Sequence, residues 1–356
     1  MLVVCAPDKL RGALDARGAA AALARGARRS GAETRELPLA DGGEGTLDAL
    51  VASGHAAVET LTVRDPFGRP VHARLGRLAA DVFLVEAAEA IGHDRISFAE
   101  QDPLAASSAG VGDLVRGALD RGARRVLVAL GGTVTVDGGL GLLGALGALP
   151  DDQVGRSLLD DPTPRREGLD SRIAHVELVA LHDVDVPLSG PDGAARLFGA
   201  QKGLRDADLS IVDDALWRLG SRLGNDLDRR AGAGAAGGLG VALYWLGASG
   251  VAGAEAVASL VGLDAALRDA SLCLTSEGAV DRQSARGKTV AAVARACARA
   301  GVPCWVLAGR VDGEGGDLLE RLGAHVRALG PPERPLAAAL RATADDLERI
   351  AEELTA

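Results

Sequence analysis

Glycine-rich loops that carry charged residues recur along this chain, and they constrain its fold more than any other feature. Examples are ADGGEGT at 40–46, GGTVTVDGG at 131–139 and SEGAVDRQSARGK at 276–288. Exposed backbone N–H groups in such turns, with a helix N-terminus behind them, form sites for phosphate or carboxylate groups. Turn chemistry alone explains one such loop. Several in one chain, with Asp, Glu and Lys embedded, predict an anion- and metal-binding active site.

The segments between the loops predict an α/β fold. Leu2 to Ala6 is a short aliphatic run that Pro7 stops, and residues 15–30 are rich in Ala and Arg with helical periodicity. Another strand is expected before Ala40. In an open sheet of this kind ligands bind at the carboxyl ends of the strands, where APDKLRGALD and ADGGEGT begin.

The sequence pattern changes from Val58 to Ala87. Here three segments rich in β-branched and aliphatic residues, on either side of the turn DPFG, predict successive antiparallel strands. The remaining elements expected in chain order are a helix at about 110–122, a strand at 125–130, a surface loop at 150–166, a strand at 176–181, helices over most of 205–229, a further helix after 240, a strand at 271–275, a last strand at 304–309 and a terminal helix near 334–355.

Composition narrows the class of protein. The chain has 356 residues, of which 47% are apolar but only 2% aromatic, so the interior must be aliphatic and packed around its 48 glycines. The net charge is −10, with both signs interspersed. The sequence has neither a basic track for a nucleic-acid backbone nor aromatic platforms for bases, which argues against a nucleic-acid partner.

The cysteines and the N-terminal sequence predict a cytoplasmic protein. Cys5, Cys273, Cys297 and Cys304 lie in apolar segments without C-x-x-C spacing, as is typical of reduced, buried thiols. The segment MLVVCAPDKL lacks the basic leader of a signal peptide, and no stretch approaches the about 20 apolar residues that cross a bilayer. We therefore expect no membrane partner; a homodimer is compatible with the sequence.

Two partial motif matches fail on their context. Gly232 to Gly237 matches G-x-G-x-x-G, but a polar, helical segment precedes it where a dinucleotide fingerprint needs a strand. Close backbone packing or approach to a nucleotide explains these glycines better. ARGKT at 285–289 ends like a Walker A loop, yet Arg282 stands at the position of its first glycine.

Isolated charged residues in the loops suit phosphoryl chemistry. Lys288 stands at a predicted helix start just after Glu277 and Asp281, an arrangement that suits Mg²⁺ and a triphosphate together; a capping acid with a solvated lysine is the alternative. Asp183, at a strand end, is placed to act as a base on a hydroxyl, or closes an Asx turn. His182 beside it is the one histidine of interest.

Lysine and arginine elsewhere in the loops suit anionic groups. Lys9 and Arg11 follow the first predicted strand, and Lys202 lies in FGAQKG. A guanidinium holds a carboxylate through two hydrogen bonds, whereas a lysine presents a point charge to phosphoryl oxygens. An ordinary surface cation is the alternative for each.

Taken together, these loops resemble the type-1 glycerate kinase family almost from end to end. VCAPDKLRGALDA is similar to the family's strand followed by A-P-D-S-F-K-G-S-L-S, and PLADGGEGTLDAL to its P-x-A-D-G-G-E-G-T segment. VEAAEAIG, DPLAASSAGVGDL, GGTVTVDGGLGLLGALG, FGAQKG, GAGAAGGLG and SEGAVDRQSARGK follow in the family's order.

The resemblance implies a two-domain α/β fold and a kinase that uses ATP and Mg²⁺ to phosphorylate D-glycerate. A discontinuous Rossmann- or flavodoxin-like domain would comprise residues 1–80 and 285–356, with an α/β domain inserted at 81–284 and the active site in the cleft between them. It implies catalytic roles for Asp183, Lys288 and Arg11 and metal binding by Glu277 and Asp281. The substrate-binding residues would be Asp8, Lys9, Arg11, Asp41, Gly42, Gly43, Glu44, Val136, Asp137 and Val186, and the nucleotide- or phosphate-binding residues Gly131, Gly132, Lys202, Gly234, Gly237 and Lys288.

The departures from the family pattern concentrate in the substrate loops. Arg11 replaces a lysine, Val136 and Val186 replace asparagines, and Ala109 and Val111 replace an arginine and a threonine. Exchanging an amide for valine removes a hydrogen-bond donor and acceptor, which costs orders of magnitude against a polar substrate. Three hypotheses follow: a glycerate kinase whose changes are drift, a kinase for another small hydroxy-acid, and a catalytically silent paralogue that binds a sugar acid or nucleotide.

Overall fold

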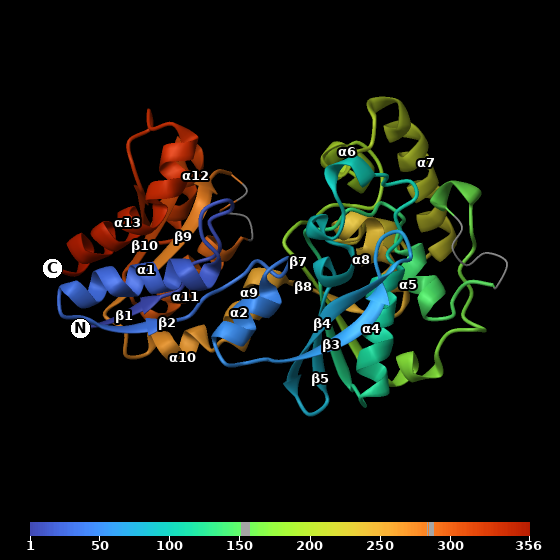
Figure 1. The fold of residues 1–356 in the computed structure, drawn as a ribbon, viewed down its shortest axis with the longest axis horizontal. Helices are drawn as coiled ribbons and strands as arrows, with labels where there is room; N and C mark the ends of the chain where they lie inside the picture. Colours follow the sequence, from blue (N-terminus) through green and yellow to red (C-terminus); the bar gives the residue numbers. More distant parts are fainter. Residues whose placement is uncertain (151–156, 283, 285–287) are drawn as a thin grey trace. The chain divides into compact units, whose positions relative to one another are not determined.

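The structure is a computed structural model that describes residues 1–150, 157–282, 284 and 288–356. These residues form two compact units (Figure 1). The first unit comprises residues 1–41, 45–55 and 252–356, and the second comprises residues 42–44 and 56–251. Each unit has its own sheet and its own hydrophobic core.

The first unit is a doubly wound parallel sheet of strand order β11-β10-β9-β1-β2. The chain adds β2 on one side of β1 and then β9, β10 and β11 on the other, so the winding reverses between β1 and β9. The elements of this unit are β1 (Leu2–Cys5), α1 (Ala16–Arg29), β2 (Glu33–Glu36), α2 (Thr46–Ala52), α9 (Gly253–Leu260), α10 (Leu263–Leu267), β9 (Leu272–Val280), α11 (Thr289–Ala300), β10 (Cys304–Val311), α12 (Gly313–Arg321), β11 (Ala324–Ala328) and α13 (Leu336–Thr355).

Helices cover both faces of this sheet. Val3 and Cys5 of β1 share a buried cluster with α1 and α13, whereas Cys273 of β9 faces the other way and contacts Cys297 of α11. Successive side chains of a strand point to opposite faces, so a strand covered on both sides must be apolar throughout. This explains the unbroken aliphatic runs at 2–6 and 271–275.

The second unit is built on a mixed sheet of order β3-β4-β5-β6-β7-β8. β3, β4 and β5 pair antiparallel, whereas β5, β6 and β7 pair parallel and in register at their carboxyl ends. The elements of this unit are β3 (Ala57–Arg64), β4 (Pro70–Ala79), β5 (Val82–Glu86), α3 (Ala88–Ile91), α4 (Ala109–Asp120), β6 (Arg125–Ala129), α5 (Leu140–Ala145), β7 (Glu177–His182), α6 (Ala194–Phe198), α7 (Asp206–Leu223), α8 (Ala235–Trp245), β8 (Ser249–Ala252) and the 3₁₀ turns η1 (His93–Arg95), η2 (Phe98–Glu100), η3 (Leu158–Asp160), η4 (Ser171–His175), η5 (Ala200–Lys202) and η6 (Leu227–Arg229).

The two-domain α/β class, with a discontinuous doubly wound part, is confirmed, and three details of the prediction are wrong. Residues 276–280 continue β9 instead of forming a loop, because β10 pairs with them as far as Val280. A further strand, β11, follows the predicted last strand. The chain passes from one unit to the other near residues 55 and 251 instead of 80 and 285, since β3 and β4 join the sheet of β5 and β9 joins that of β1. The cleft remains a prediction.

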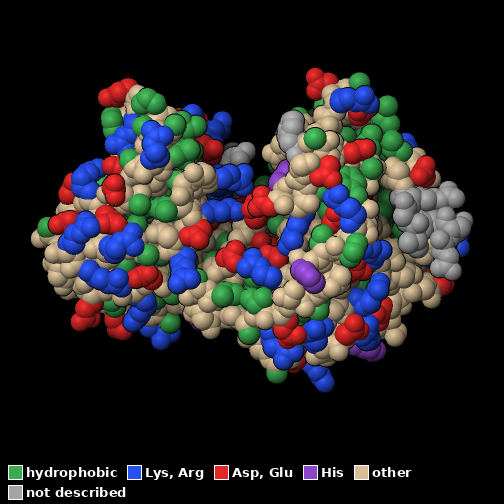
Figure 2. Space-filling view, in the orientation of Figure 1, with side chains coloured by type: hydrophobic (Ala, Val, Ile, Leu, Met, Phe, Trp, Pro, Cys, Tyr) green, Lys and Arg blue, Asp and Glu red, His purple; other side chains and the backbone are tan. Residues whose placement is uncertain are grey.

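Other features of the described residues agree with the composition. All four cysteines are free and buried. Among the described residues, no helix combines the length and apolarity required to cross a membrane. Figure 2 shows positive and negative side chains interspersed over the visible face of each unit. The predicted surface loop at 150–166 lies partly outside the described residues, because 151–156 are not among them.

Helices α1 and α13 approach so closely that a single glycine decides their packing (Figure 1). A Cβ on Gly26 of α1 would lie 2.0 Å from the carbonyl oxygen of Glu348 and 2.9 Å from the Cβ of Ala351, both on α13. The nearest obstacle is backbone, which cannot rotate out of the way. The two helices therefore require glycine here.

We expect Gly26→Ala to lower the free energy of unfolding by about 3 kcal/mol or more, because overpacking against backbone forces the helices apart. Urea denaturation measures the change. Gly18→Ala, on the same helix but away from α13, is the matched control and should have a far smaller effect. Equal effects of the two substitutions would contradict this account of the packing.

Candidate active-site residues in the two units

In the first unit, acidic residues gather where the strand order reverses. Asp8 follows β1, and its backbone N–H donates to the carbonyl of Ser276 on the adjacent β9 at 3.3 Å. Glu277 is the next residue of β9. A reversal of this kind leaves a crevice at the carboxyl ends of the two strands, which is where open α/β sheets bind ligands.

The carboxyl of Asp8 is held from two sides. It accepts a hydrogen bond from the backbone N–H of Lys9 at 2.6 Å and another from the hydroxyl of Thr289, the first residue of α11. Burial, with the negative charge of Asp41 nearby, raises the pKa of Asp8 to about 7. Two neighbouring carboxylates in this position favour a proton or a cation between them.

Glu277 and Lys288 form an ion pair beside this cluster. Lys288 is the N-cap residue of α11, and its Nζ lies 2.9 Å from Oε1 of Glu277. Burial raises the pKa of Glu277 despite the lysine, and within the described part of the chain its second oxygen, Oε2, is buried without a hydrogen-bond partner. The pair brings together two residues that the sequence predicted to act on metal and phosphate.

The remaining predicted residues of this unit lie in turns. Asp281 accepts a hydrogen bond from the backbone N–H of Ser284 at 3.1 Å and so closes the turn after β9. Arg11 is exposed, and Lys9 lies against Gly45. Residues 285–287 of the ARGKT segment lie outside the described residues. Among the described residues, no three His, Cys, Asp or Glu side chains form a preformed metal cluster.

In the second unit, Lys202 is a buried cation. It is 4% exposed, and its Nζ donates to Oγ1 of Thr133 at 3.0 Å and to the carbonyl of Thr135 at 2.9 Å. Burial lowers the pKa of Lys202 to about 7, while the charge of Asp137 acts in the opposite direction. A buried ammonium whose hydrogen-bond partners among the described residues are neutral oxygens is costly unless an anion joins it.

Asp137 anchors the loop that contacts Lys202. Its Oδ2 accepts hydrogen bonds from the N–H and Oγ of Ser108, both at 2.8 Å, and from the N–H of Gly141 at 3.0 Å. Its Oδ1 accepts from the N–H of Gly139 at 3.0 Å. The carboxylate therefore ties together the starts of α4 and α5, and most of its acceptor capacity is used within the protein.

In this unit two glycines predicted to bind phosphate pack closely against the segment 42–44, Gly131 against its backbone and Gly132 against the side chain of Glu44. A Cβ on Gly131 would lie 2.9 Å from the Cα of Gly43, and one on Gly132 would lie 2.8 Å from the Cβ of Glu44. The segment Gly42 to Glu44 thus belongs with the loop after β6.

The G-x-G-x-x-G segment also packs against backbone, one of the two roles suggested by its sequence. A Cβ on Gly237 would lie 2.0 Å from the carbonyl oxygen of Thr135, and one on Gly234 would lie 2.2 Å from that of Pro187. Nucleotide binding by Gly234 and Gly237 remains a prediction.

The end of β7 carries the remaining predicted residues. Asp183 follows the strand directly and is half-buried, whereas Val186 is buried. His182 is buried too; its Nδ1 lies 3.1 Å from the carbonyl of Val184 and its Nε2 lies 3.2 Å from the hydroxyl of Tyr244. Burial lowers the pKa of His182. These contacts make it a packed core histidine.

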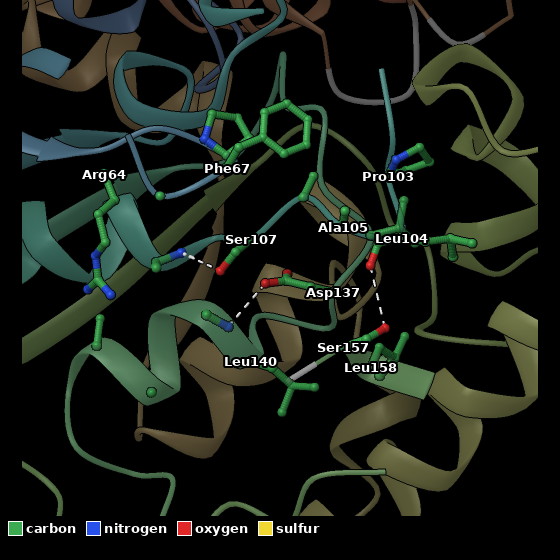
Figure 3. A pocket seen from close by; sticks show the side chains of 18 of the residues that line it. Arg64, Phe67, Pro103, Leu104, Ala105, Ser107, Asp137, Leu140, Ser157 and Leu158 are labelled. Atoms are coloured by element: carbon green, nitrogen blue, oxygen red, sulfur yellow. Dashed lines mark hydrogen bonds between the residues drawn. The ribbon is translucent and has the colours of Figure 1, made fainter. Parts of the chain in front are cut away.

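A cavity of about 480 Å³ lies within the second unit, between the turn after β3, the segment before α4, the helix α5 and η3. Val136 and Asp137 form part of its wall. Figure 3 shows Asp137 and Ser107 in the middle of this region, with Phe67 on one side and Leu140 on the other.

The structure regroups the predicted residues. Glu277, Asp281 and Lys288 belong to the first unit with Asp8 and Asp41, whereas Gly42 to Glu44 belong to the second. Sequence reasoning missed the hydroxyl of Thr289 and the partners of Lys202 in the loop after β6. The distribution of lysine also marks these loops. Of the 39 lysine and arginine residues in the chain only three are lysines, and Lys9, Lys202 and Lys288 all lie in these loops.

Comparison with known proteins points to one family. A sequence model of the glycerate kinase family matches residues 3–356. A glycerate kinase from Bacillus subtilis (strain 168) is 34% identical, over 100% of this chain and 97% of the relative. A glycerate 2-kinase from Escherichia coli (strain K12) is 34% identical, over 89% and 87% of the two chains. A crystal structure from Salmonella typhimurium LT2, provisionally assigned as glycerate kinase 2, is 34% identical with a TM-score of 0.83, over 100% of this chain and 97% of that one.

The burial of Lys202 has a consequence for stability. Between its folded pKa of about 7 and its unfolded value of 10.5, the unfolded chain holds a proton on this amine that the folded chain lacks. Raising the pH through this window therefore stabilises the folded protein, whereas below pH 7 both states carry the proton. We expect the free energy of unfolding of wild type, relative to Lys202→Met, to rise by about 2 kcal/mol from pH 7 to pH 9.

Urea unfolding at pH 6, 7 and 9 measures this difference. Arg229→Met removes an exposed cation from the same unit and should leave the wild-type pH dependence unchanged. If the free energy of unfolding of wild type relative to Lys202→Met stays constant from pH 6 to pH 9, the amine does not titrate in this window.

Proposed function

This chain belongs to the glycerate kinase family, and we propose that it transfers the γ-phosphoryl group of ATP to a hydroxyl of D-glycerate. The observation that carries the proposal is the match to glycerate kinases along essentially the whole chain. The three lysines support it from within the molecule, because each lies in a loop that also contains acidic or glycine residues. In a chain that otherwise uses arginine, these positions favour a compact, titratable point charge.

Phosphoryl transfer needs positioning and charge neutralisation more than covalent chemistry. Lys202 suits the phosphoryl oxygens, since its buried ammonium has one N–H beyond the two bonded to Thr133 and Thr135. An arriving anion would hold the proton on this amine at neutral pH, because it replaces water that burial has removed. Lys288, held by Glu277 at the start of α11, would present a second positive charge.

The first unit offers oxygen donors that fit a magnesium ion. Burial and the nearby charge of Asp41 raise the pKa of Asp8, and Oε2 of Glu277 is buried without a hydrogen-bond partner among the described residues. Hard carboxylate oxygens are the ligands that Mg²⁺ takes. We propose that Asp8 and Asp41 hold the ion together with Glu277 or Asp281; when bound, it would neutralise phosphate charge.

For the acceptor, we propose that Asp183 orients or deprotonates the hydroxyl and that Arg11 holds the carboxylate. Asp183 stands at the carboxyl end of β7, and Arg11 is exposed and able to reach a ligand. Lys9 would assist Arg11.

A different small hydroxy-acid is the second candidate acceptor. Val136 is buried, and it contributes an apolar side chain to the cavity wall. An apolar side chain there suits a less polar acceptor than glycerate. A silent paralogue that only binds its ligands is the third hypothesis.

We also propose that the protein works in the cytoplasm. Its four free, buried cysteines are typical of a reducing compartment.

The reaction is tested by ADP release from Mg-ATP with D-glycerate and a panel of short hydroxy-acids. Turnover on D-glycerate would mean that the valine substitutions are tolerated. Turnover on another acid alone would make Val136, Val186 and Arg11 the specificity determinants. No turnover on any acid, together with ATP binding, would favour the silent paralogue. Phosphorus NMR of the product identifies the hydroxyl that is phosphorylated.

Replacing Lys288 by Met should lower kcat by about 10²- to 10³-fold with folding intact, since it removes a charge that matters most in the transition state. ADP release measures the rate, and circular dichroism checks the fold. Arg321→Met, which removes an exposed cation from α12, is the matched control. Wild-type turnover by Lys288→Met would exclude the assigned role.

A further inference from the structure

We propose that His182 and Tyr244 are positioning residues for Asp183, and that they fix the direction in which its side chain leaves the end of β7. This inference rests on the proposed function, in which Asp183 orients or deprotonates the acceptor hydroxyl. It deepens that assignment, because it names the two side chains that hold the backbone around Asp183. Both act through Asp183 and not on the substrate itself.

The side chain of His182 bridges the backbone on both sides of Asp183. His182 is the last residue of β7, and its Nδ1 lies 3.1 Å from the carbonyl oxygen of Val184. A carbonyl can only accept, so an Nδ1–H group donates here and closes a small ring around the backbone of Asp183. Such a ring restricts the dihedral angles of the residue that it encloses, as an Asx turn does. The direction of the Asp183 side chain therefore depends on how the imidazole is held.

The hydroxyl of Tyr244 and a glycine hold the imidazole. The hydroxyl oxygen lies 3.2 Å from Nε2 of His182 and also donates to the carbonyl of Ala231 at 2.6 Å. A Cβ on Gly232 would lie 2.6 Å from Cγ of His182, so backbone packs directly against the imidazole ring. The guanidinium of Arg230 lies 4.2 Å from the centre of the Tyr244 ring, which is buried on α8. The imidazole is thus held both at its edge and on its face.

Backbone hydrogen bonds join the same two segments farther along the chain. The N–H of Gly234 donates to the carbonyl of Val186 at 2.9 Å, and the N–H of Leu188 donates to that of Asp228 at 2.9 Å. These bonds hold residues 186–188 against residues 228–234. The contact between the imidazole and the hydroxyl extends this linkage to the residue that precedes Asp183. It is the part of the linkage made by side chains, so substitution can test it.

The two side chains share their protons and so cannot act independently. Burial lowers the pKa of His182, which favours a neutral ring with one N–H group. With the O–H of Tyr244, two protons then serve three contacts: with Val184, between the two side chains, and with Ala231. Removing one polar group therefore changes the contacts of the other, and we expect their effects to be coupled.

The test removes each polar contact with little change in volume. Tyr244→Phe deletes only the hydroxyl and keeps the aromatic ring against Arg230. His182→Asn keeps an N–H donor near the place of Nδ1, whereas His182→Leu removes both contacts. Thr343→Val, in α13 of the first unit, is the matched control, because it also deletes a buried hydroxyl that donates to a carbonyl, here that of Ala339 at 2.9 Å.

We expect Tyr244→Phe to lower kcat about tenfold with the KM for ATP unchanged, because a small displacement of a reacting group slows the reaction without weakening nucleotide binding. His182→Leu should lower kcat further, and His182→Asn should recover part of that loss. Thr343→Val should keep the wild-type kcat. Transfer of label from radiolabelled ATP to the acid measures the rates of the full chain, and circular dichroism checks each fold.

A double-mutant cycle separates positioning from a purely structural role. In an Asp183→Asn background, Tyr244→Phe should cause no further loss of kcat, since the effects of residues that act as one unit do not add. Equal losses in the two backgrounds would overturn the proposal, as would wild-type kcat in Asp183→Asn or in folded Tyr244→Phe. So would a folded His182→Asn that is no more active than folded His182→Leu. If His182→Leu does not fold, Tyr244→Phe and the cycle decide.

The outcomes distinguish failure of this inference from failure of the proposed function. Wild-type protein that phosphorylates D-glycerate, with an unchanged kcat in Tyr244→Phe, would keep its function and lose the positioning role. Wild-type protein that phosphorylates no acid would end the kinase function, and the positioning role with it.

Discussion

The carboxylate of Asp137 organises the second unit around its candidate functional groups. It accepts hydrogen bonds from Ser108 at the start of α4 and from Gly139 and Gly141 at the start of α5. Helix N-termini have unsatisfied N–H groups and a partial positive charge, so a buried anion satisfies both at once. The loop fixed in this way carries the partners of Lys202 on one side and part of the cavity wall on the other. Without this anchor, neither feature would have a defined position.

In the first unit, topology has the corresponding role. The winding reverses between β1 and β9, so the segments that follow these strands diverge and leave their carboxyl ends uncovered. Asp8 and Glu277 lie there, and the start of α11 supplies Thr289 and Lys288 to bind them. Acidic groups that would repel one another are held together by a hydroxyl, a backbone N–H and one lysine. Burial, together with the nearby charge of Asp41, raises the pKa of Asp8.

Small residues make both arrangements possible. With few aromatic side chains, the interior is filled by aliphatic groups and by backbone that packs directly on backbone. Gly237 admits the carbonyl of Thr135, and Gly26 admits that of Glu348. Such contacts bring distant segments close together. They also make these glycines intolerant of substitution, because an added Cβ meets a backbone atom that cannot rotate away.

The sequence by itself determined the α/β class, most of the strands and helices, the family and the set of charged loop residues. These depend on local patterns: aliphatic runs at 2–6 and 125–130, helical periodicity at 15–30, and turn residues at fixed positions. Tertiary structure alone decided which residues act together. Glu277 joins Asp8 because β9 pairs with β1, and that pairing links residues some 270 positions apart in the chain, as the hydrogen bond from Thr275 to Ala6 illustrates. The burial of Lys202, the anchoring role of Asp137 and the cavity beside them likewise depend on contacts between distant segments, which no local pattern encodes.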